Sequence, residues 1–249
     1  MSGHSKWHSI KHQKAKEDKK RGKLFSKLVR EITVAAREGG GDPDFNPRLR
    51  MAIDRANDAN MPKENIDKAI KRGTGELDGV DYIEKVYEGY GPGGVAVIVN
   101  VTTDNKNRAV SQIRKIFDEH NGSLGENGCV SWMFKRKGFI TVEKEVIDED
   151  SLMEKSIELG VEDLNIEDEY YEIITEVDDF AKVKESLEKF VSIDSADLTM
   201  IPNTYIKLTG RKAKNMLKLM EALENNDDVQ KVFANFNIPT EEFEKVENI

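Results

Sequence analysis

Apolar residues at helical spacing fill the first part of the chain. Between residues 24 and 36 they recur every three or four positions, along one face of a helix that the glycines at 39–41 end. Asn46-Pro47 has the form of an N-cap followed by a proline at the first helical position, and Pro62 begins a further apolar pattern that ends at Gly73. The pattern therefore predicts three amphipathic helices joined by short turns, which is typical of a small bundle.

After Gly73 the pattern becomes typical of strands. Residues 82–90 and the run at 95–102, which is rich in β-branched residues, predict two strands. Residues 107–120 predict a helix and residues 129–134 a further strand. A helix at 212–224 and a strand at 229–236 follow much later in the chain.

The segment between these two stretches has an order of its own. It predicts strand, helix, strand, strand, helix and strand, at residues 139–143, 149–159, 163–166, 171–175, 180–190 and 197–201. This order is the split βαβ, or ferredoxin-like, arrangement. Because the stretch before it has strands but only one helix, we expect the last helix and strand of the chain to complete that stretch.

The predicted fold class is therefore α+β, with an N-terminal three-helix bundle followed by two α/β domains of ferredoxin-like character, one inserted in the other. A chain of 249 residues is long enough for two or three domains. The changes of pattern predict a basic leader and bundle at 1–77, a discontinuous α/β domain at 78–134 plus 205–249, and an inserted ferredoxin-like domain at 135–204.

Positive charge is concentrated at the start of an acidic chain. Residues 1–72 contain 18 Lys and Arg against 10 Asp and Glu, whereas residues 73–249 contain 20 against 37, and the formal net charge is −9. A polyanion that binds a cationic patch releases its condensed counterions, so such a patch favours nucleic acid as the partner.

The basic residues of the first predicted helix share one face. They project within about a third of the helix circumference at 100° per residue, nearly opposite the apolar stripe. A solvated polar face is the alternative, but such a face usually mixes signs, and only Glu31 and Glu38 lie alongside. In the leader before the helix, Trp7 can stack on a base, and its lysines and histidines, His4 among them, can meet phosphates. The predicted nucleic-acid-binding residues are Lys6, Trp7, His8, Lys11, His12, Lys14, Lys16, Lys19, Lys20, Arg21, Lys23, Lys27, Arg30 and Arg37.

Other chemistries have little support in the sequence. The leader histidines lie four apart, but zinc needs further ligands and the neighbouring lysines repel a cation, so no metal is expected. The run 89–94 matches G-x-G-x-x-G, yet a strand follows it instead of a helix, which indicates a hairpin connection and no dinucleotide cofactor. Cys129 is the one cysteine, and no placed histidine accompanies it. We expect a protein without catalytic activity.

The composition also indicates the cellular compartment of the protein. A chain with a single cysteine forms no internal disulfide, which fits a reducing compartment. No stretch approaches the roughly 20 apolar residues that cross a bilayer, and no apolar stretch follows the basic leader as in a secretory signal. The sequence therefore predicts a cytoplasmic protein that does not engage a membrane, and it indicates no oligomeric state.

Several motifs resemble those of the YebC/PmpR family. The resemblance covers essentially the whole chain and is specific up to residue 134. It is carried by Gly3-His4-Ser5-Lys6-Trp7, Lys20-Arg21-Gly22-Lys23 with Phe25-Ser26-Lys27, Ala36-Arg37-Glu38-Gly39-Gly40, Asp42-Pro43, Asn46-Pro47, Ala59-Asn60-Met61-Pro62, the run 87–94, Thr103-Asp104-Asn105, Asp227-Asp228-Val229-Gln230 and Ala234-Asn235-Phe236.

The resemblance implies three domains, one interrupting another, and two alternative functions. The family is generally described as cytoplasmic, DNA-binding transcriptional regulators. Another view places its members in translation, at the ribosome, when proline runs stall synthesis. The partner is then promoter DNA in the first case, and ribosomal or transfer RNA in the second. Lysine meets phosphates without reading bases well, which on physical grounds favours the second.

Overall fold

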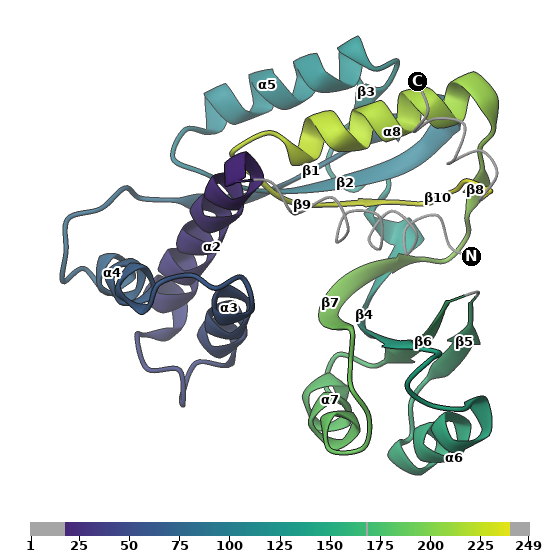
Figure 1. The fold of residues 1–249 in the computed structure, drawn as a ribbon. Helices are drawn as coiled ribbons and strands as arrows, with labels where there is room; N and C mark the ends of the chain where they lie inside the picture. Colours follow the sequence, from purple (N-terminus) through teal and green to yellow (C-terminus); the bar gives the residue numbers. More distant parts are fainter. Residues whose placement is uncertain (1–17, 168, 240–249) are drawn as a thin grey trace. The chain divides into compact units, whose positions relative to one another are not determined.

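The structure, a computed structural model, describes residues 18–167 and 169–239, with the side chains of residues 18–20 left out. It divides into two compact units (Figure 1). One comprises residues 131–205. The other is formed by the described residues before and after that segment, so the chain leaves it and returns to it.

The discontinuous unit begins with the three predicted helices, α2 (Asp18–Gly39), α3 (Pro47–Asp58) and α4 (Lys63–Gly73). Their core contains Leu28, Ile32 and Leu49, which are buried where the helices meet. The helix α2 begins six residues before the apolar pattern does, and Leu24 is 43% exposed. The predicted three-helix arrangement is thus confirmed, with the apolar face starting one turn later than expected.

The turn between α2 and α3 is held by one buried side chain. The Oδ1 atom of Asn46 accepts a hydrogen bond from the backbone N–H of Leu49, as the predicted N-cap requires. Its Nδ2 donates to the carbonyl oxygens of Ala35 and Gly40, both at 2.8 Å. A single amide therefore ties the end of one helix to the start of the next.

Two glycines of the bundle should respond oppositely to a methyl group. A Cβ at Gly73 would meet the carbonyl oxygen of Thr33 and the Cβ of Ala36, so Gly73→Ala should push α4 from α2 and cost about 1–3 kcal/mol. At Gly22, inside α2, a Cβ would meet nothing within 4 Å, and Gly22→Ala should stabilise by about 0.5–1 kcal/mol. Urea unfolding followed by circular dichroism measures both, and equal effects would contradict this packing.

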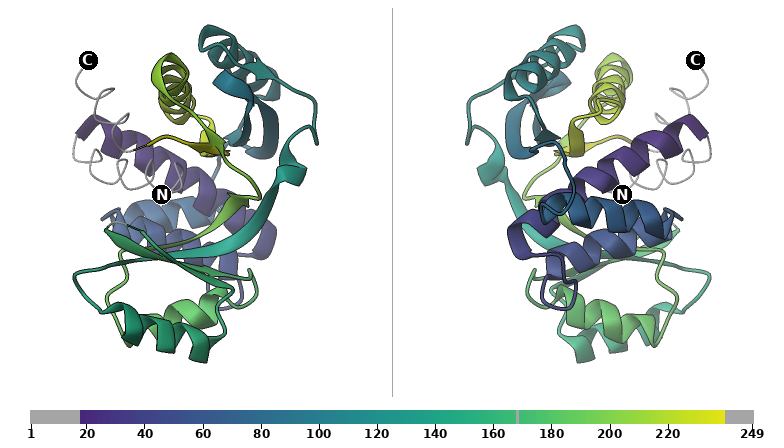
Figure 2. Two further views of the ribbon diagram at one scale, coloured as in Figure 1. Left: turned by 90° about the vertical axis from the view of Figure 1, so that its right-hand side faces the viewer. Right: turned by 90° about the vertical axis from the view of Figure 1, so that its left-hand side faces the viewer.

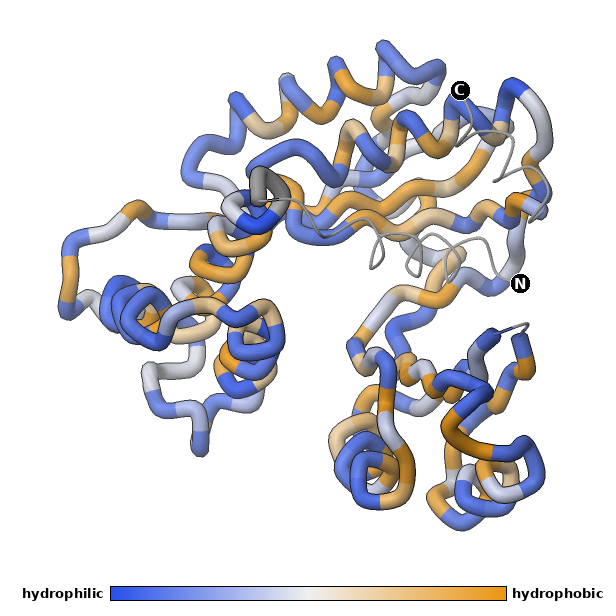
Figure 3. The backbone as a smooth tube through the Cα atoms, viewed as in Figure 1, coloured by the Kyte–Doolittle hydropathy of each residue, from blue (hydrophilic) through white to orange (hydrophobic). Residues whose placement is uncertain are grey.

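The rest of the discontinuous unit is a four-stranded antiparallel sheet in the order β3-β1-β2-β9, with two helices on one face (Figures 1 and 2). Val97 and Val99 of β2, one of the two inner strands, pack against Phe117 and Met216 of these helices. In Figure 3 that strand is an almost continuous apolar segment. The elements are β1 (Ile83–Gly91), β2 (Val95–Thr103), α5 (Lys106–Glu119), β3 (Ser123–Leu124), β8 (Ile206–Lys207), α8 (Gly210–Glu224), β9 (Val229–Ala234) and β10 (Phe236–Asn237).

One strand prediction is wrong here, and another is confirmed with an interruption. The expected strand at 129–134 is a turn followed by a 3-10 helix, Ser131–Met133, because the Glu88 carboxylate accepts hydrogen bonds from the N–H groups of Gly128 and Val130 and folds the loop back. The expected strand at 229–236 is interrupted at Asn235, whose side chain accepts from the N–H of Ala96. Beyond it, β10 pairs in parallel with β8, a strand that the pattern did not predict.

The unit at 131–205 has the predicted alternation of elements. Its antiparallel sheet has the order β5-β6-β4-β7, and both helices lie on one face (Figures 1 and 2). Position 138, in the inner strand β4, requires a glycine, because a Cβ there would meet the ring of Phe180 and the hydroxyl of Thr175. The elements are β4 (Phe134–Glu143), α6 (Glu149–Leu159), β5 (Asp163–Ile166), β6 (Tyr170–Thr175), α7 (Phe180–Glu188) and β7 (Ser195–Pro202).

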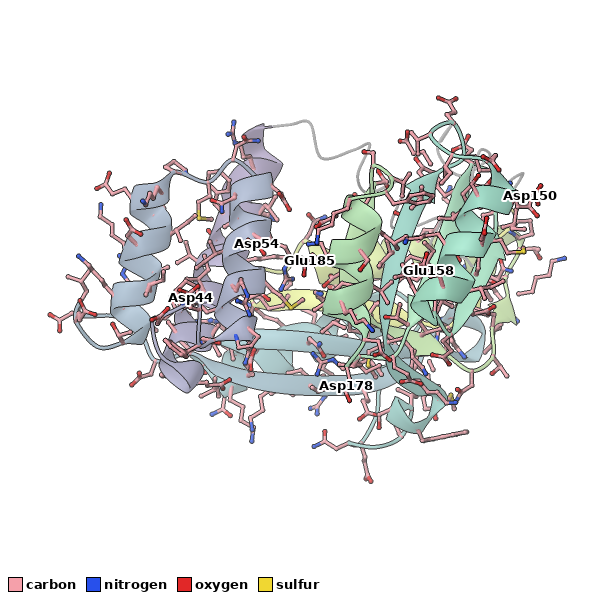
Figure 4. All side chains as sticks on the ribbon, turned by 90° about the horizontal axis from the view of Figure 1, so that it is seen from below. Asp44, Asp54, Asp150, Glu158, Asp178 and Glu185 are labelled. Carbon is pink, nitrogen blue, oxygen red and sulfur yellow. The ribbon has the colours of Figure 1, made fainter. Side chains whose placement is uncertain are left out.

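The surface of this unit is strongly acidic. Residues 131–205 contain 20 Asp and Glu against 8 Lys and Arg. Four of these acids are exposed and are labelled in Figure 4: Asp150 and Glu158 on α6, Asp178 just before α7, and Glu185 on α7. Asp148 caps α6 through the N–H of Ser151, a hydrogen bond that lowers the pKa of its carboxyl. The acidic run at 148–150 thus stands at a helix N-terminus, as expected from the helix dipole.

Candidate nucleic-acid interface

The structure describes only part of the predicted interface. Lys19 and Lys20 lie in α2 without described side chains. Five candidate cations are described in full: Arg21, Lys23, Lys27, Arg30 and Arg37. The remaining candidates lie outside the described residues: Lys6, Trp7, His8, Lys11, His12, Lys14 and Lys16, together with His4.

Two lysines of α2 contact the end of α8. The Nζ atom of Lys23 donates to the carbonyl oxygen of Asn225 at 2.9 Å, and the Nζ of Lys27 donates to that of Glu224 at 2.7 Å. The last carbonyls of a helix have no partner within it and carry the negative end of the helix dipole. These two cations therefore cap a helix that is about two hundred residues away in sequence.

Arg30, two turns from Lys23 on α2, is held more tightly. Its Nη1 donates to the carbonyl oxygens of Asp227 (2.5 Å) and Thr102 (3.2 Å) and to Oδ1 of Asp228 (2.8 Å). The guanidinium also lies over the ring of Tyr82, 5.4 Å from its centroid. The predicted outward-facing stripe is therefore wrong at Lys27 and Arg30, which are half-buried against the sheet-bearing part of the same unit.

Asp228 is the centre of this network. It is 3% exposed, and its carboxylate also accepts hydrogen bonds from Nη2 of Arg108 and from the hydroxyl of Thr103. Arg108 donates to Asp104 as well, and these carboxylates, Asp228 first, raise the pKa of the Arg108 guanidinium. The hydrogen bond from Arg108 lowers the pKa of the Asp104 carboxyl in return. The two arginines therefore share one buried carboxylate.

Two further cations of α2 have other contacts. The guanidinium of Arg21 lies 5.4 Å from the centroid of the Phe25 ring. Arg37 donates to the carbonyl oxygen of Tyr82 and lies 4.0 Å from the exposed carboxylate of Asp81. Both side chains are exposed and can turn towards an incoming phosphate, unlike that of Arg30.

Sequence reasoning missed the acceptors of this network. Asp104 and Asp228 belong to two of the motifs that carried the resemblance, and the structure brings these motifs together beside α2. Neither motif has a recognisable chemical spacing, and they lie more than a hundred residues apart. The available signal was the pair of adjacent acids, Asp227-Asp228, directly after a predicted helix, where acids are disfavoured by the dipole unless cations compensate them.

The network borders a cavity of about 470 Å³. Cations, acids, amide side chains and one tyrosine line it together. Its lining is Lys23, Arg30, Tyr82, Asp104, Arg108, Gln112, Asn225, Asn226, Asp227 and Asp228.

Other candidate chemistries find no support in the described part of the chain. No group of His, Cys, Asp and Glu side chains there could hold a metal ion. The glycine-rich run connects β1 to β2 as a hairpin, with Gly91 opposite Val95. Burial, and then the charge of Glu88, raises the pKa of the Cys129 thiol, which disfavours the nucleophilic thiolate. Among the helices described, none has the length and apolar character needed to cross a membrane.

The chain is similar to known proteins over almost its whole length. Residues 5–76 match a model described as the TACO1/YebC protein N-terminal domain, and residues 82–236 match one described as the TACO1/YebC second and third domain. Probable transcriptional regulatory proteins of Geobacter sulfurreducens and Persephonella marina are each 57% identical over 99% of this chain and 100% of their own length. A crystal structure of a conserved hypothetical protein from Aquifex aeolicus is 52% identical, with a TM-score of 0.82, and covers 91% of this chain and 94% of that one.

Proposed function

Since the chain belongs to the TACO1/YebC family, we propose that it is a cytoplasmic nucleic-acid-binding regulator of gene expression and has no catalytic activity. The observation that carries the proposal is the charge distribution. Residues 1–72 have an excess of eight cations, while the whole chain has a net charge of −9. A phosphate backbone is attracted to the first region and repelled by the remainder, so the protein binds in one orientation.

The domain organisation that we propose supports this orientation. The basic leader and bundle form one domain, residues 78–134 with 205–249 a second, and residues 135–204 an inserted ferredoxin-like third. Each sheet has a strand order that a ferredoxin-like domain can have, the first with β1 moved to the front of the chain. In this division the cations concentrate in one domain and the acids in the inserted one.

Two nucleic-acid partners remain, and one observation favours each. The names of the relatives favour promoter DNA. The contacts of α2 favour the alternative, a translation factor that binds ribosomal or transfer RNA and relieves stalling at proline-rich sequences. A helix that reads DNA presents its side chains to base edges, whereas Lys23, Lys27 and Arg30 hold α2 on its own chain.

Sedimentation separates the two partners. If the protein acts in translation, it should move with ribosomes through a sucrose gradient, and more of it should do so when synthesis is stalled on a proline run. High salt should release it, because the contacts are with phosphates. The same preparation is titrated with a promoter-length DNA duplex of several sequences. Absence from ribosomal fractions together with sequence-selective, salt-resistant binding to DNA would leave transcription as the function.

A further inference from the structure

The helical bundle and the sheet of the discontinuous unit have separate apolar cores. The bundle is built around Ile32, Leu49 and their neighbours, and the sheet around Val97, Phe117 and theirs, and the two clusters share no residue among those described. The described hydrogen bonds between α2 and the sheet-bearing part come from cationic side chains. The exposed contact of Lys23 is weak and is screened by salt, whereas the half-buried pair of Arg30 and Asp228 costs more to break. Because neither contact belongs to an apolar core, the junction can open without unfolding either core.

The cations that hold the junction are the ones expected to meet nucleic acid. Lys23 and Lys27 neutralise the negative end of α8, and Arg30 reaches the buried carboxylate of Asp228. A carbonyl oxygen, a carboxylate oxygen and a phosphate oxygen are interchangeable acceptors for a lysine or arginine donor. Each of these cations can therefore serve either its own chain or a phosphate, but not both fully at once.

The cavity beside the junction gives a phosphate a route to these donors. Lys23 and Arg30 of α2 and Arg108 of α5 line it. Because the side chain of Arg108 is 41% exposed, whereas that of Arg30 is 16% exposed, a phosphate can approach Arg108 before the junction has opened and reaches Arg30 afterwards. The exchange of acceptors can then proceed stepwise, one cation after another.

We propose that α2 is held on α8 by an electrostatic latch, formed by Lys23, Lys27 and Arg30, that nucleic acid opens. Phosphate oxygens replace the carbonyl oxygens of residues 224, 225 and 227 and the Asp228 carboxylate. The proposal rests on the proposed nucleic-acid binding and adds its regulation. The measured affinity equals the intrinsic affinity multiplied by the fraction of molecules in which the latch is open. A change that opens the latch therefore raises affinity without adding a contact.

The distance between α2 and α8 tests the latch directly. Spin labels are attached at Ser26→Cys and Lys218→Cys, both exposed positions on these helices, in a chain that also carries Cys129→Ser. Pulsed electron resonance measures their separation alone and with saturating single-stranded RNA or a DNA duplex. We expect one short separation in the free protein and a longer one when nucleic acid is bound. Binding that leaves the separation unchanged overturns the proposal.

A matched pair of variants opens the latch without nucleic acid. Asp228→Asn removes the charge that anchors Arg30, and Asp118→Asn removes the same charge from the exposed face of α5. The first should lengthen the label separation and raise the affinity for RNA about three- to tenfold. The second should do neither. Equal effects of the two variants would reduce the result to net charge and overturn the latch.

The outcomes separate the latch from the proposed function. If no nucleic acid binds at low salt but Asp228→Asn lengthens the separation, the junction is real and the proposed function is wrong. If nucleic acid binds and the separation changes with neither RNA nor Asp228→Asn, the function stands and the latch is wrong. Should Asp228→Asn not fold, the wild-type separation with and without RNA decides.

Discussion

Replacing Asp228 by alanine should lower the free energy of unfolding of the discontinuous unit by about 3 kcal/mol. The carboxylate is 3% exposed and accepts hydrogen bonds from Arg30, Arg108 and Thr103. Its removal leaves a half-buried guanidinium and a buried hydroxyl without this acceptor. We place the cost at the low end of the range for broken buried ion pairs because Arg108, 41% exposed, can turn to water.

The neighbouring residue provides the control. Asp227 has an exposed side chain and contributes to the network through its carbonyl oxygen, which Asp227→Ala retains. That change should alter the free energy of unfolding by less than about 0.5 kcal/mol. Urea denaturation with a common slope measures both. Similar losses for the two variants would mean that the local backbone, and not the carboxylate, stabilises this turn.

The sequence predicts elements well where one physical cause determines them. Asn46-Pro47 predicts a helix start because the asparagine side chain can accept a first-turn N–H, and because the proline lacks an N–H that would have no partner there. The helix α3 does begin at Pro47. The run at 95–99, which is Val and Ile except for one Ala, becomes part of a central strand buried on both faces. The strand predicted at residues 129–134 does not form, although the composition there is typical of a strand. The Glu88 carboxylate, forty residues before the loop, accepts hydrogen bonds from two of its N–H groups and folds it into a turn.

The candidate interface divides in the same way. The charge of α2 and the common face of its cations can be derived from spacing, since helical geometry is regular. Where that face points cannot be derived, because it depends on Asp228 and on the end of α8, two hundred residues away. A periodic pattern reports which side chains lie together, and it contains no information about which distant acceptor they meet.

Reversing three charges of the leader should weaken nucleic-acid binding roughly a hundredfold or more at low salt. Lys6, Lys11 and Lys14 lie outside the described residues, so the expectation rests on charge alone. The slope of log affinity against log salt is negative, and each lost phosphate contact should reduce its magnitude by about 0.9 for duplex DNA and about 0.7 for single strands. A combined Lys→Glu change at all three positions should thus reduce the slope by roughly 2–3.

The acidic unit provides a control with the same change in net charge. Lys182, Lys184 and Lys189 lie on or beside α7, and Lys→Glu at these positions also lowers the net charge by six. If the leader meets phosphates, this variant should keep the wild-type salt slope and lose little affinity, since it removes no proposed phosphate contact and therefore changes no counterion release. Fluorescence anisotropy with labelled RNA and DNA across a salt series measures both variants. Equal losses would mean that net charge, and not the leader, governs binding.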